Sequence, residues 1–178
     1  MLKSIFAPLL SILLAAALLL GVNCGLSGTR DANEKAELDA KLLEILPGST
    51  AFEQEEYTGD DANIRCVYKA DKGYVILTAT QGYAGTITML VGVSNEGKVE
   101  GLQIREMSET YGLGWNALTD ADFLKQFLDT KGDAQVGTNV DAIAGATVTS
   151  KAIARSVNSA VAFVTGADAD SGATSWGG

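Results

Sequence analysis

Residues 141–150 combine side chains and spacing that could hold a phosphate group. They read Asp-Ala-Ile-Ala-Gly-Ala-Thr-Val-Thr-Ser, and apolar residues follow them at helical spacing. Gly145 and Ala146 leave the backbone accessible, and Thr147 places a hydroxyl where the helix is expected to begin. Because the first N–H groups of a helix lack partners and the helix dipole is positive there, an anion is stabilised at this end. The alternative interpretation is an ordinary turn and helix cap without a ligand.

Apolar periodicity predicts the helices that position this segment. A helical period predicts helices over residues 31–46, from Thr119-Asp120 onward, and over residues 150–164. The first of these ends at Pro47-Gly48, a common helix terminator, and is expected to act as a stalk or docking helix. The apolar faces comprise Leu38, Leu42, Ile45 and Leu46, then Phe123, Leu124, Phe127 and Leu128, and finally Ile153, Val157, Val161 and Val164.

Alternation of apolar and polar residues predicts strands in the middle of the chain. The predicted strands cover residues 64–68, 74–80, 87–93 and 102–104, with turns at 71–73 and 95–98. Short turns between consecutive strands are typical of an antiparallel meander. We therefore expect an α+β fold in which the helices pack on one face of an antiparallel sheet.

The N-terminus is predicted to be a membrane anchor. No charged residue occurs between Ile5 and Val22, and at about 1.5 Å per residue such a helix would reach roughly 27 Å, close to the thickness of a bilayer core. Lys3 precedes this segment, so the N-terminus is expected in the cytoplasm and the remaining chain outside it. A cleavable signal peptide is the alternative. Asn23 before Cys24 does not suit a lipoprotein cleavage site, which favours a single uncleaved span.

Composition excludes several classes of function. The net charge is −9, which disfavours nucleic acid and anionic lipid headgroups as partners. The chain has no histidine, and its two cysteines, Cys24 and Cys66, are too few for a zinc or iron–sulfur site. These cysteines could form a disulfide or remain free thiols. Redox chemistry would therefore require an organic cofactor or the metal of a partner.

Three short motifs occur in a characteristic order. They are Gly-Tyr-Ala-Gly at 82–85, Glu-Thr-Tyr-Gly-Leu-Gly at 109–114, and the segment 141–147. In this order they resemble the FMN-binding domain family, and within it the G subunits of Rnf-type ion-translocating electron-transport complexes. The C subunits of sodium-pumping NADH:quinone reductases are related to these. A short chain with one N-terminal anchor suits the G subunits better.

The resemblance implies a covalent flavin. In this family the phosphate of FMN forms a phosphodiester with the threonine that closes an Asp-x-x-Ser/Thr-Gly-Ala-Thr motif. Thr147 matches this threonine, Gly145 and Ala146 precede it, and Asp141 begins the motif. The chain departs from the motif at Ala144, which removes one hydroxyl near the phosphate but leaves the acceptor intact.

Further hydroxyls lie near this acceptor in the sequence. Thr149 and Ser150 are expected to supply hydrogen bonds to the phosphate. A second copy of the motif ends at Thr174, where too few residues follow to form a helix. Thr174 is therefore interpreted as a coincidence of a low-complexity tail or as a secondary modification site.

The middle motif is implied to line the isoalloxazine ring. In the family it usually reads His-x-Glu-Thr-Pro-Gly-Leu-Gly. Met107 replaces the histidine and Tyr111 replaces the proline, which alters the stiffness and hydrogen bonding of this loop. The residues that match are Glu109, Thr110, Gly112, Leu113 and Gly114. The alternative is a glycine-rich exit from a hairpin with an exposed carboxylate.

Two aromatic residues are further candidates for contact with the flavin. Tyr83 could contact the ring, although a tyrosine at the start of a strand more often packs at the edge of a core. Trp115 could also be a neighbour of the ring, and its alternative role is a hydrophobic plug.

These observations predict a division of the chain. Residues 1–24 form a transmembrane anchor, 25–62 a stalk or docking helix region, 63–165 an extracytoplasmic FMN-binding domain, and 166–178 a flexible tail.

The function implied by the resemblance is electron relay rather than an enzymatic activity of the chain alone. The complex would couple electron flow between ferredoxin and NAD to ion movement, with FMN attached by a flavin transferase, and the partners would be other subunits of the membrane complex. Two alternatives remain open. One is an anchored binding or assembly module without flavin, and the other is a stand-alone flavoprotein that serves another extracytoplasmic reductase.

Overall fold

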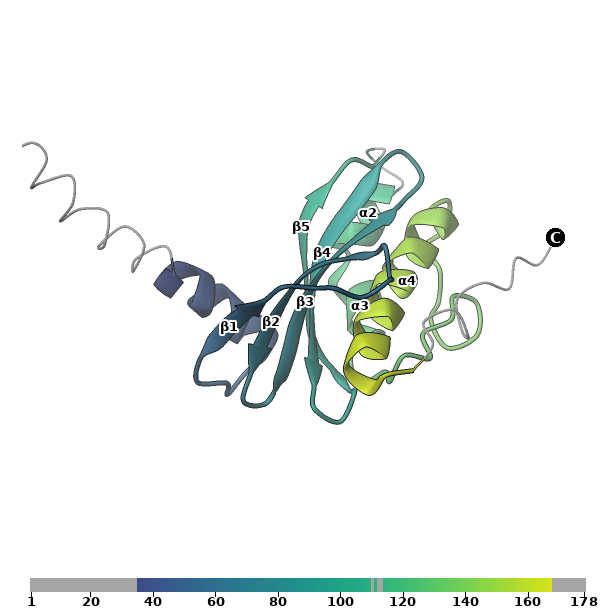
Figure 1. Cartoon of the computed structure of the whole chain (residues 1–178). Helices are drawn as coiled ribbons and strands as arrows, with labels where there is room; N and C mark the ends of the chain where they lie inside the picture. The colour runs from purple at the N-terminus through teal and green to yellow at the C-terminus, as the bar shows by residue number, and fades with distance from the viewer. Residues whose placement is uncertain (1–34, 110, 112–113, 168–178) are drawn as a thin grey trace, which may run out of the picture. The chain divides into compact units, whose positions relative to one another are not determined.

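A computed structural model describes residues 35–109, 111 and 114–167 (Figure 1). The chain divides into two units, Met1–Ala40 and Lys41–Gly178, and the second contains the sheet. The predicted anchor at 1–24 lies outside the described residues, as does most of the predicted tail. Within the described part of the chain, no helix has the length and apolar character needed to cross a bilayer.

The sheet has five strands in the order β1-β2-β3-β4-β5, and each neighbouring pair is antiparallel. The strands are β1 (Phe52–Glu55), β2 (Ile64–Ala70), β3 (Gly73–Gln81), β4 (Thr86–Ser94) and β5 (Val99–Met107). Strands β2 to β5 confirm the predicted meander. Because the order in space follows the order in sequence, the turn between β3 and β4 lies at the opposite end of the sheet from the turns that flank it.

Strand β1 was not predicted, because this region was assigned to a stalk or docking helix. It pairs with β2, with Phe52 opposite Ala70 and Glu55 opposite Val67. Its sequence, Phe-Glu-Gln-Glu, contains one apolar residue, and Phe52 is buried. A short edge strand with a polar outer face shows almost no alternation of apolar and polar residues, so its sequence does not identify it as a strand. The sheet therefore begins earlier in the chain than residue 63.

Three helices follow the sheet, α2 (Gly114–Thr119), α3 (Ala121–Lys125) and α4 (Thr147–Thr165). The side chain of Asp120 caps α3 by accepting hydrogen bonds from the N–H groups of Asp122 and Phe123, as the sequence indicated. The predicted helix was too long. After Lys125 the chain continues in tight turns, such as the bond from Phe127 N to Leu124 O, so Phe127 remains buried while Leu128 is exposed.

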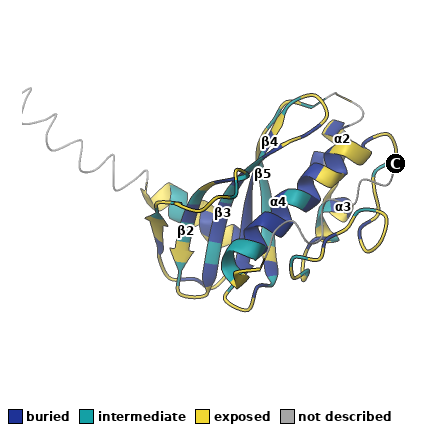
Figure 2. Cartoon of the chain, turned by 45° about the vertical axis from the view of Figure 1, so that its right-hand side comes forward, coloured by how far each residue is buried: buried dark blue, intermediate teal, exposed yellow. Residues whose placement is uncertain are grey.

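Helix α4 packs along one face of the sheet, across β3 and β4 (Figures 1 and 2). Its buried face includes the predicted Ile153, Val157 and Val161. Buried hydroxyls add specific contacts, because Thr80 Oγ1 on β3 donates to Ala152 O at 3.1 Å and lies 2.8 Å from Ser156 Oγ. These contacts fix the position of the helix along the sheet.

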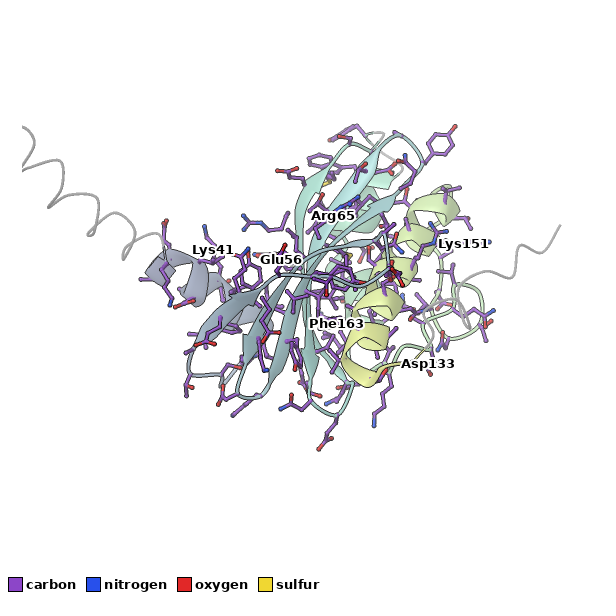
Figure 3. All side chains as sticks on the ribbon, viewed as in Figure 1. Lys41, Glu56, Arg65, Asp133, Lys151 and Phe163 are labelled. Carbon is purple, nitrogen blue, oxygen red and sulfur yellow. The ribbon has the colours of Figure 1, made fainter. Side chains whose placement is uncertain are left out.

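The C-terminal end of α4 is held by aromatic rings. Phe163, labelled in Figure 3, makes edge-to-face contacts with Tyr57 and Tyr74, with ring centroids 5.9 and 5.6 Å apart. Such pairs stabilise by about 0.5–1.5 kcal/mol beyond their burial. The helix is thus secured at its middle and at its end, and its first residue is placed accordingly.

The other face of the sheet is covered as well, which corrects the expectation that the helices pack on one face. Residues 35–45 are helical, and Leu42, Ile45 and Leu46 are buried. Ile45 lies against Gly92 and Gly101, which are directly opposite each other on β4 and β5. A Cβ atom added at Gly92 would lie 2.5 Å from Ile45 O. The two glycines therefore let backbone approach backbone at this contact.

Replacement of Gly101 by alanine tests this contact. The new methyl would collide with Ile45 O, a backbone atom that can move only with its segment. We expect the free energy of unfolding to fall by about 1–3 kcal/mol, the usual range for overpacking. Urea denaturation followed by circular dichroism measures it.

Glu100→Ala is the matched control, because Glu100 is exposed on the same strand and pairs with Lys98 at the surface. Its effect should stay within about 0.5 kcal/mol. A Gly101→Ala protein as stable as the parent would contradict the packing of residues 42–46 on the sheet.

Candidate flavin site

The three motifs meet at one end of the sheet, where the turn between β3 and β4 lies near the first residues of α2 and α4 (Figure 1). Glu109 joins them. Its carboxylate accepts hydrogen bonds from Tyr83 N, at 2.8 Å from Oε1, and from Ala84 N, at 3.3 Å from Oε2. The motifs at 82–85 and 109–114, which are separated by all of β4 and β5, are thus in direct contact.

Glycines allow the 82–85 turn and the start of α2 to approach Glu109. A Cβ atom on Gly82 would collide with Glu109 Oε1. A Cβ atom on Gly114, the first residue of α2, would lie 2.6 Å from Glu109 Oε2 and 2.8 Å from Thr149 Oγ1. Gly114 is therefore a packing position between Glu109 and α4. Thr110, Gly112 and Leu113 lie outside the described residues.

The turn before α4 is held by its own backbone and by one side chain. Gly145 has φ 78°, in the left-handed region that glycine adopts without strain. Ala146 N donates to Ile143 O at 2.9 Å. Ser150 Oγ donates to Ala146 O at 2.9 Å and accepts from Ile143 N at 3.4 Å. The hydroxyl of Ser150 thus fastens this turn, and its role toward a phosphate stays a prediction.

Thr147 is the first residue of α4 and is exposed. The first hydrogen bond of the helix runs from Ser150 N to Ala146 O, and Ala146 provides no side-chain cap. The N–H groups of Thr147, Val148 and Thr149 therefore have no carbonyl partner within the helix. An exposed hydroxyl beside three such groups is suited to carry an anionic phosphoryl group.

Thr149 supplies an unusual polar atom at this end of α4. The residue is 1% exposed, and its Oγ1 has no hydrogen-bond partner within the described part of the chain. A buried hydroxyl without a partner costs about 1–3 kcal/mol. Such a group is expected where a ligand supplies the missing bond.

Asp141 and Ala144 are both exposed on the loop that leads to the turn. The N–H of Asp141 donates to Gln126 Oε1 at 2.8 Å. Gln126 follows directly after α3, so this bond ties the start of the third motif to that helix. Gln126 was not predicted as a site residue, because a lone glutamine after a helix carries no recognisable pattern.

Exposed aromatic side chains surround this end of the molecule. Tyr83 is 71% exposed, Tyr111 is 85% exposed and Trp115 is 39% exposed. The rings of Tyr111 and Trp115 lie 6.2 Å apart in a tilted arrangement. Trp115 is therefore not a buried plug, and Tyr83 does not pack at the edge of the core. Met107, in the place of the family histidine, is half-buried at the end of β5.

The shifted pKa values belong to groups outside the three motifs. Burial raises the pKa of Tyr68 to about 12, and its hydrogen bond with Cys66 acts in the same direction. Hydrogen bonds to Glu55 and to Asp129 raise the pKa values of Lys69 and Lys98, which are exposed. No cluster of potential metal ligands occurs among the described residues.

The start of α4 thus suits a phosphate group. The exposed aromatic side chains at the same end of the molecule suit a planar ring. Residues 82–162, which include all three motifs, match the FMN-binding domain. The fold and the site therefore define a flavin-binding protein, and FMN is its cofactor.

Curated relatives extend this result. The chain is 36% identical over 139 residues, 69% of its length and 72% of the relative, to the G subunit of the ion-translocating oxidoreductase complex of Methanosarcina acetivorans. It is 42% identical over 110 residues, 55% of its length and 59% of the relative, to the G subunit of the proton-translocating ferredoxin:NAD(+) oxidoreductase complex of Clostridium ljungdahlii. This chain belongs to the family of G subunits of ion-translocating oxidoreductase complexes.

The match to some relatives is partial. A further relative is the G subunit of the Na(+)-translocating ferredoxin:NAD(+) oxidoreductase complex of Acetobacterium woodii, at 37% identity over 98 residues, 50% of this chain. The chain spans 59% and 47% of the length of the Clostridium and Acetobacterium proteins.

Replacement of Thr149 by valine tests the buried hydroxyl. Valine has nearly the same shape and removes a polar atom that lacks a partner. In protein without flavin, we expect the free energy of unfolding to rise by about 1 kcal/mol. Urea denaturation measures it. Thr80→Val is the control and should destabilise the protein, because the Thr80 hydroxyl is hydrogen-bonded. A destabilised Thr149→Val protein would mean that this hydroxyl has a bonding partner in solution.

Proposed function

We propose that this chain carries FMN joined by a phosphodiester to Thr147 and relays electrons within a membrane-bound ion-translocating oxidoreductase complex of the ferredoxin:NAD type. The observation that carries the proposal is the exposed hydroxyl of Thr147, at the uncapped start of a long helix after a left-handed glycine. FMN supplies chemistry that the side chains lack, since it accepts two electrons and can release them singly.

The protein residues hold the cofactor and shape its surroundings. The N–H groups at the start of α4 are positioned to bind the phosphate oxygens, with the helix dipole in the favourable direction. Thr149 Oγ1 is available for a further hydrogen bond. Tyr83, Tyr111 and Trp115 offer apolar surface at the same end of the molecule.

The proposed partners follow from the names of the relatives, which are subunits of ion-translocating complexes. We infer that this chain assembles with other subunits of such a complex and that a flavin transferase attaches the FMN. Its strongly acidic composition makes nucleic acid an unsuitable partner.

Peptide mass spectrometry tests the attachment site. In protein produced together with a flavin transferase, the peptide that contains Thr147 should carry the mass of FMN minus water. Thr147→Ala should lose this adduct and the flavin fluorescence of the denatured band, because alanine offers no oxygen for the phosphodiester. Native folding of the variant is checked by circular dichroism.

Thr174→Ala is the matched control, since Thr174 ends the second copy of the motif and lies outside the described residues. This variant should keep the full adduct on Thr147. An unmodified Thr147 beside a modified Thr174 would overturn the assignment, and an adduct on neither threonine would contradict covalent attachment.

The anchor at residues 1–24 is part of the same proposal. We infer a single membrane span with a cytoplasmic N-terminus and an extracytoplasmic domain, on the basis of Lys3 ahead of the uncharged segment from Ile5 to Val22.

Thiol labelling measures this topology. Cys66 is a partly buried cysteine on β2 that forms no disulfide among the described residues, so a reagent that cannot cross membranes should reach it in intact cells once the exposed domain is unfolded. The Cys24→Ser background makes Cys66 the reporter, and Cys66→Ser in that background is the control. Labelling that requires cell lysis would place the domain in the cytoplasm and contradict the proposal.

A further inference from the structure

Glu109 occupies the junction of the three motif segments. Its two carboxylate oxygens accept hydrogen bonds from the adjacent N–H groups of Tyr83 and Ala84. The turn that presents these groups joins β3 to β4, whereas Glu109 follows the end of β5. The carboxylate therefore fastens the turn to a segment that is distant in the sequence.

Two glycines pack against the carboxylate of Glu109. Gly82 packs against Oε1 and Gly114 packs against Oε2, and in both cases a side chain would collide with the carboxylate. Gly114 also contacts the region of Thr149 Oγ1, the buried hydroxyl two residues after the attachment threonine. The carboxylate is thus enclosed by the 82–85 turn, the start of α2 and the first turn of α4.

We propose that Glu109 is a positioning residue, whose carboxylate holds the 82–85 turn against the starts of α2 and α4 and thereby sets the environment of the flavin ring. This role rests on the proposed attachment of FMN to Thr147. Glu109 acts through the backbone of Tyr83 and Ala84 and not through direct contact with the cofactor.

The chemistry of the contact suits a carboxylate. The two N–H groups bond different oxygens of Glu109, and a carboxylate offers both of its oxygens as charged acceptors in one plane. In Glu109→Gln one acceptor becomes an NH₂ group, which faces another donor. This substitution is nearly isosteric, so it breaks one bond of the pair and leaves the packing around Gly82 and Gly114 in place.

The same contact holds the backbone of Tyr83. Its side chain is largely exposed while its N–H is bonded to Glu109, so the ring extends from a backbone that the contact holds in place. Loss of the carboxylate contact releases the backbone that carries this ring. The expected result is a looser environment beside Thr147 without loss of the acceptor hydroxyl.

Hydrogen exchange tests the contact in protein without flavin. In Glu109→Gln, at least one of the amides of Tyr83 and Ala84 should exchange about tenfold faster or more, because its hydrogen bond to a charged group is lost. Glu106→Gln is the matched control, as Glu106 is exposed on β5 and its loss removes the same charge nearby. Unchanged exchange at both amides in Glu109→Gln would overturn the proposal.

The flavin provides the second readout. In flavin-loaded protein, Glu109→Gln should retain the full adduct on Thr147 but lower the fluorescence anisotropy of the flavin, because the ring environment is less ordered. Glu106→Gln should leave the anisotropy unchanged. In Gly82→Ala the new methyl collides with Glu109 Oε1 and pushes the turn away from the intact carboxylate. This variant should reproduce the Glu109→Gln result even if the latter fails to fold.

The outcomes separate two failures. A parent protein without flavin on Thr147 would overturn the proposed function and this role together. Flavin attached to Thr147 with parental anisotropy in both Glu109→Gln and Gly82→Ala would overturn the positioning role alone. An equal change in Glu106→Gln would assign the effect to charge and would also overturn it.

Discussion

The docking of α4 on the sheet is the constraint on which the site depends. A long helix could slide along an apolar surface. The Thr80 hydroxyl prevents this, because it can bond to Ala152 O and Ser156 Oγ only when α4 lies at one position along β3. The rings around Phe163 secure the far end of the helix. Since the helix is rigid, its first residue, Thr147, has a defined place beside the turn between β3 and β4. Thr147 is thus positioned by contacts more than a turn away.

Much of this arrangement could be predicted from the sequence. The four long strands and α4 have strong periodicity, and the Gly-Ala-Thr segment is recognisable at the start of a helix. The strand β1 and the helix α2 were missed, because a strand with one apolar residue and a helix of six residues carry little periodic signal. Sequence patterns identify helices and strands in which buried residues recur at regular spacing. β1 and α2 are too short for such a repeat and depend on contacts with neighbouring elements.

The roles of polar residues were harder to predict than their presence. Ser150 was expected to bind phosphate, and the structure shows a bond that the sequence did not indicate, from its hydroxyl to Ala146 O. Glu109 was expected in the loop that lines the ring, and the structure adds that its carboxylate accepts hydrogen bonds from two backbone amides at this end of the sheet. The partners of Glu109 depend on tertiary packing that brings distant backbone groups together, whereas those of Ser150 belong to the local turn before α4.

The glycine pair on β4 and β5 has a mechanical consequence. Ile45 O lies against Gly92 and Gly101 without an intervening side chain, so backbone contacts backbone directly. A force applied to residues 42–46 would load the middle of the two strands directly. One of these strands begins just after the 82–85 turn, and the other leads to Glu109. The two strands therefore connect the packing of residues 42–46 to the end of the sheet where the three motifs meet.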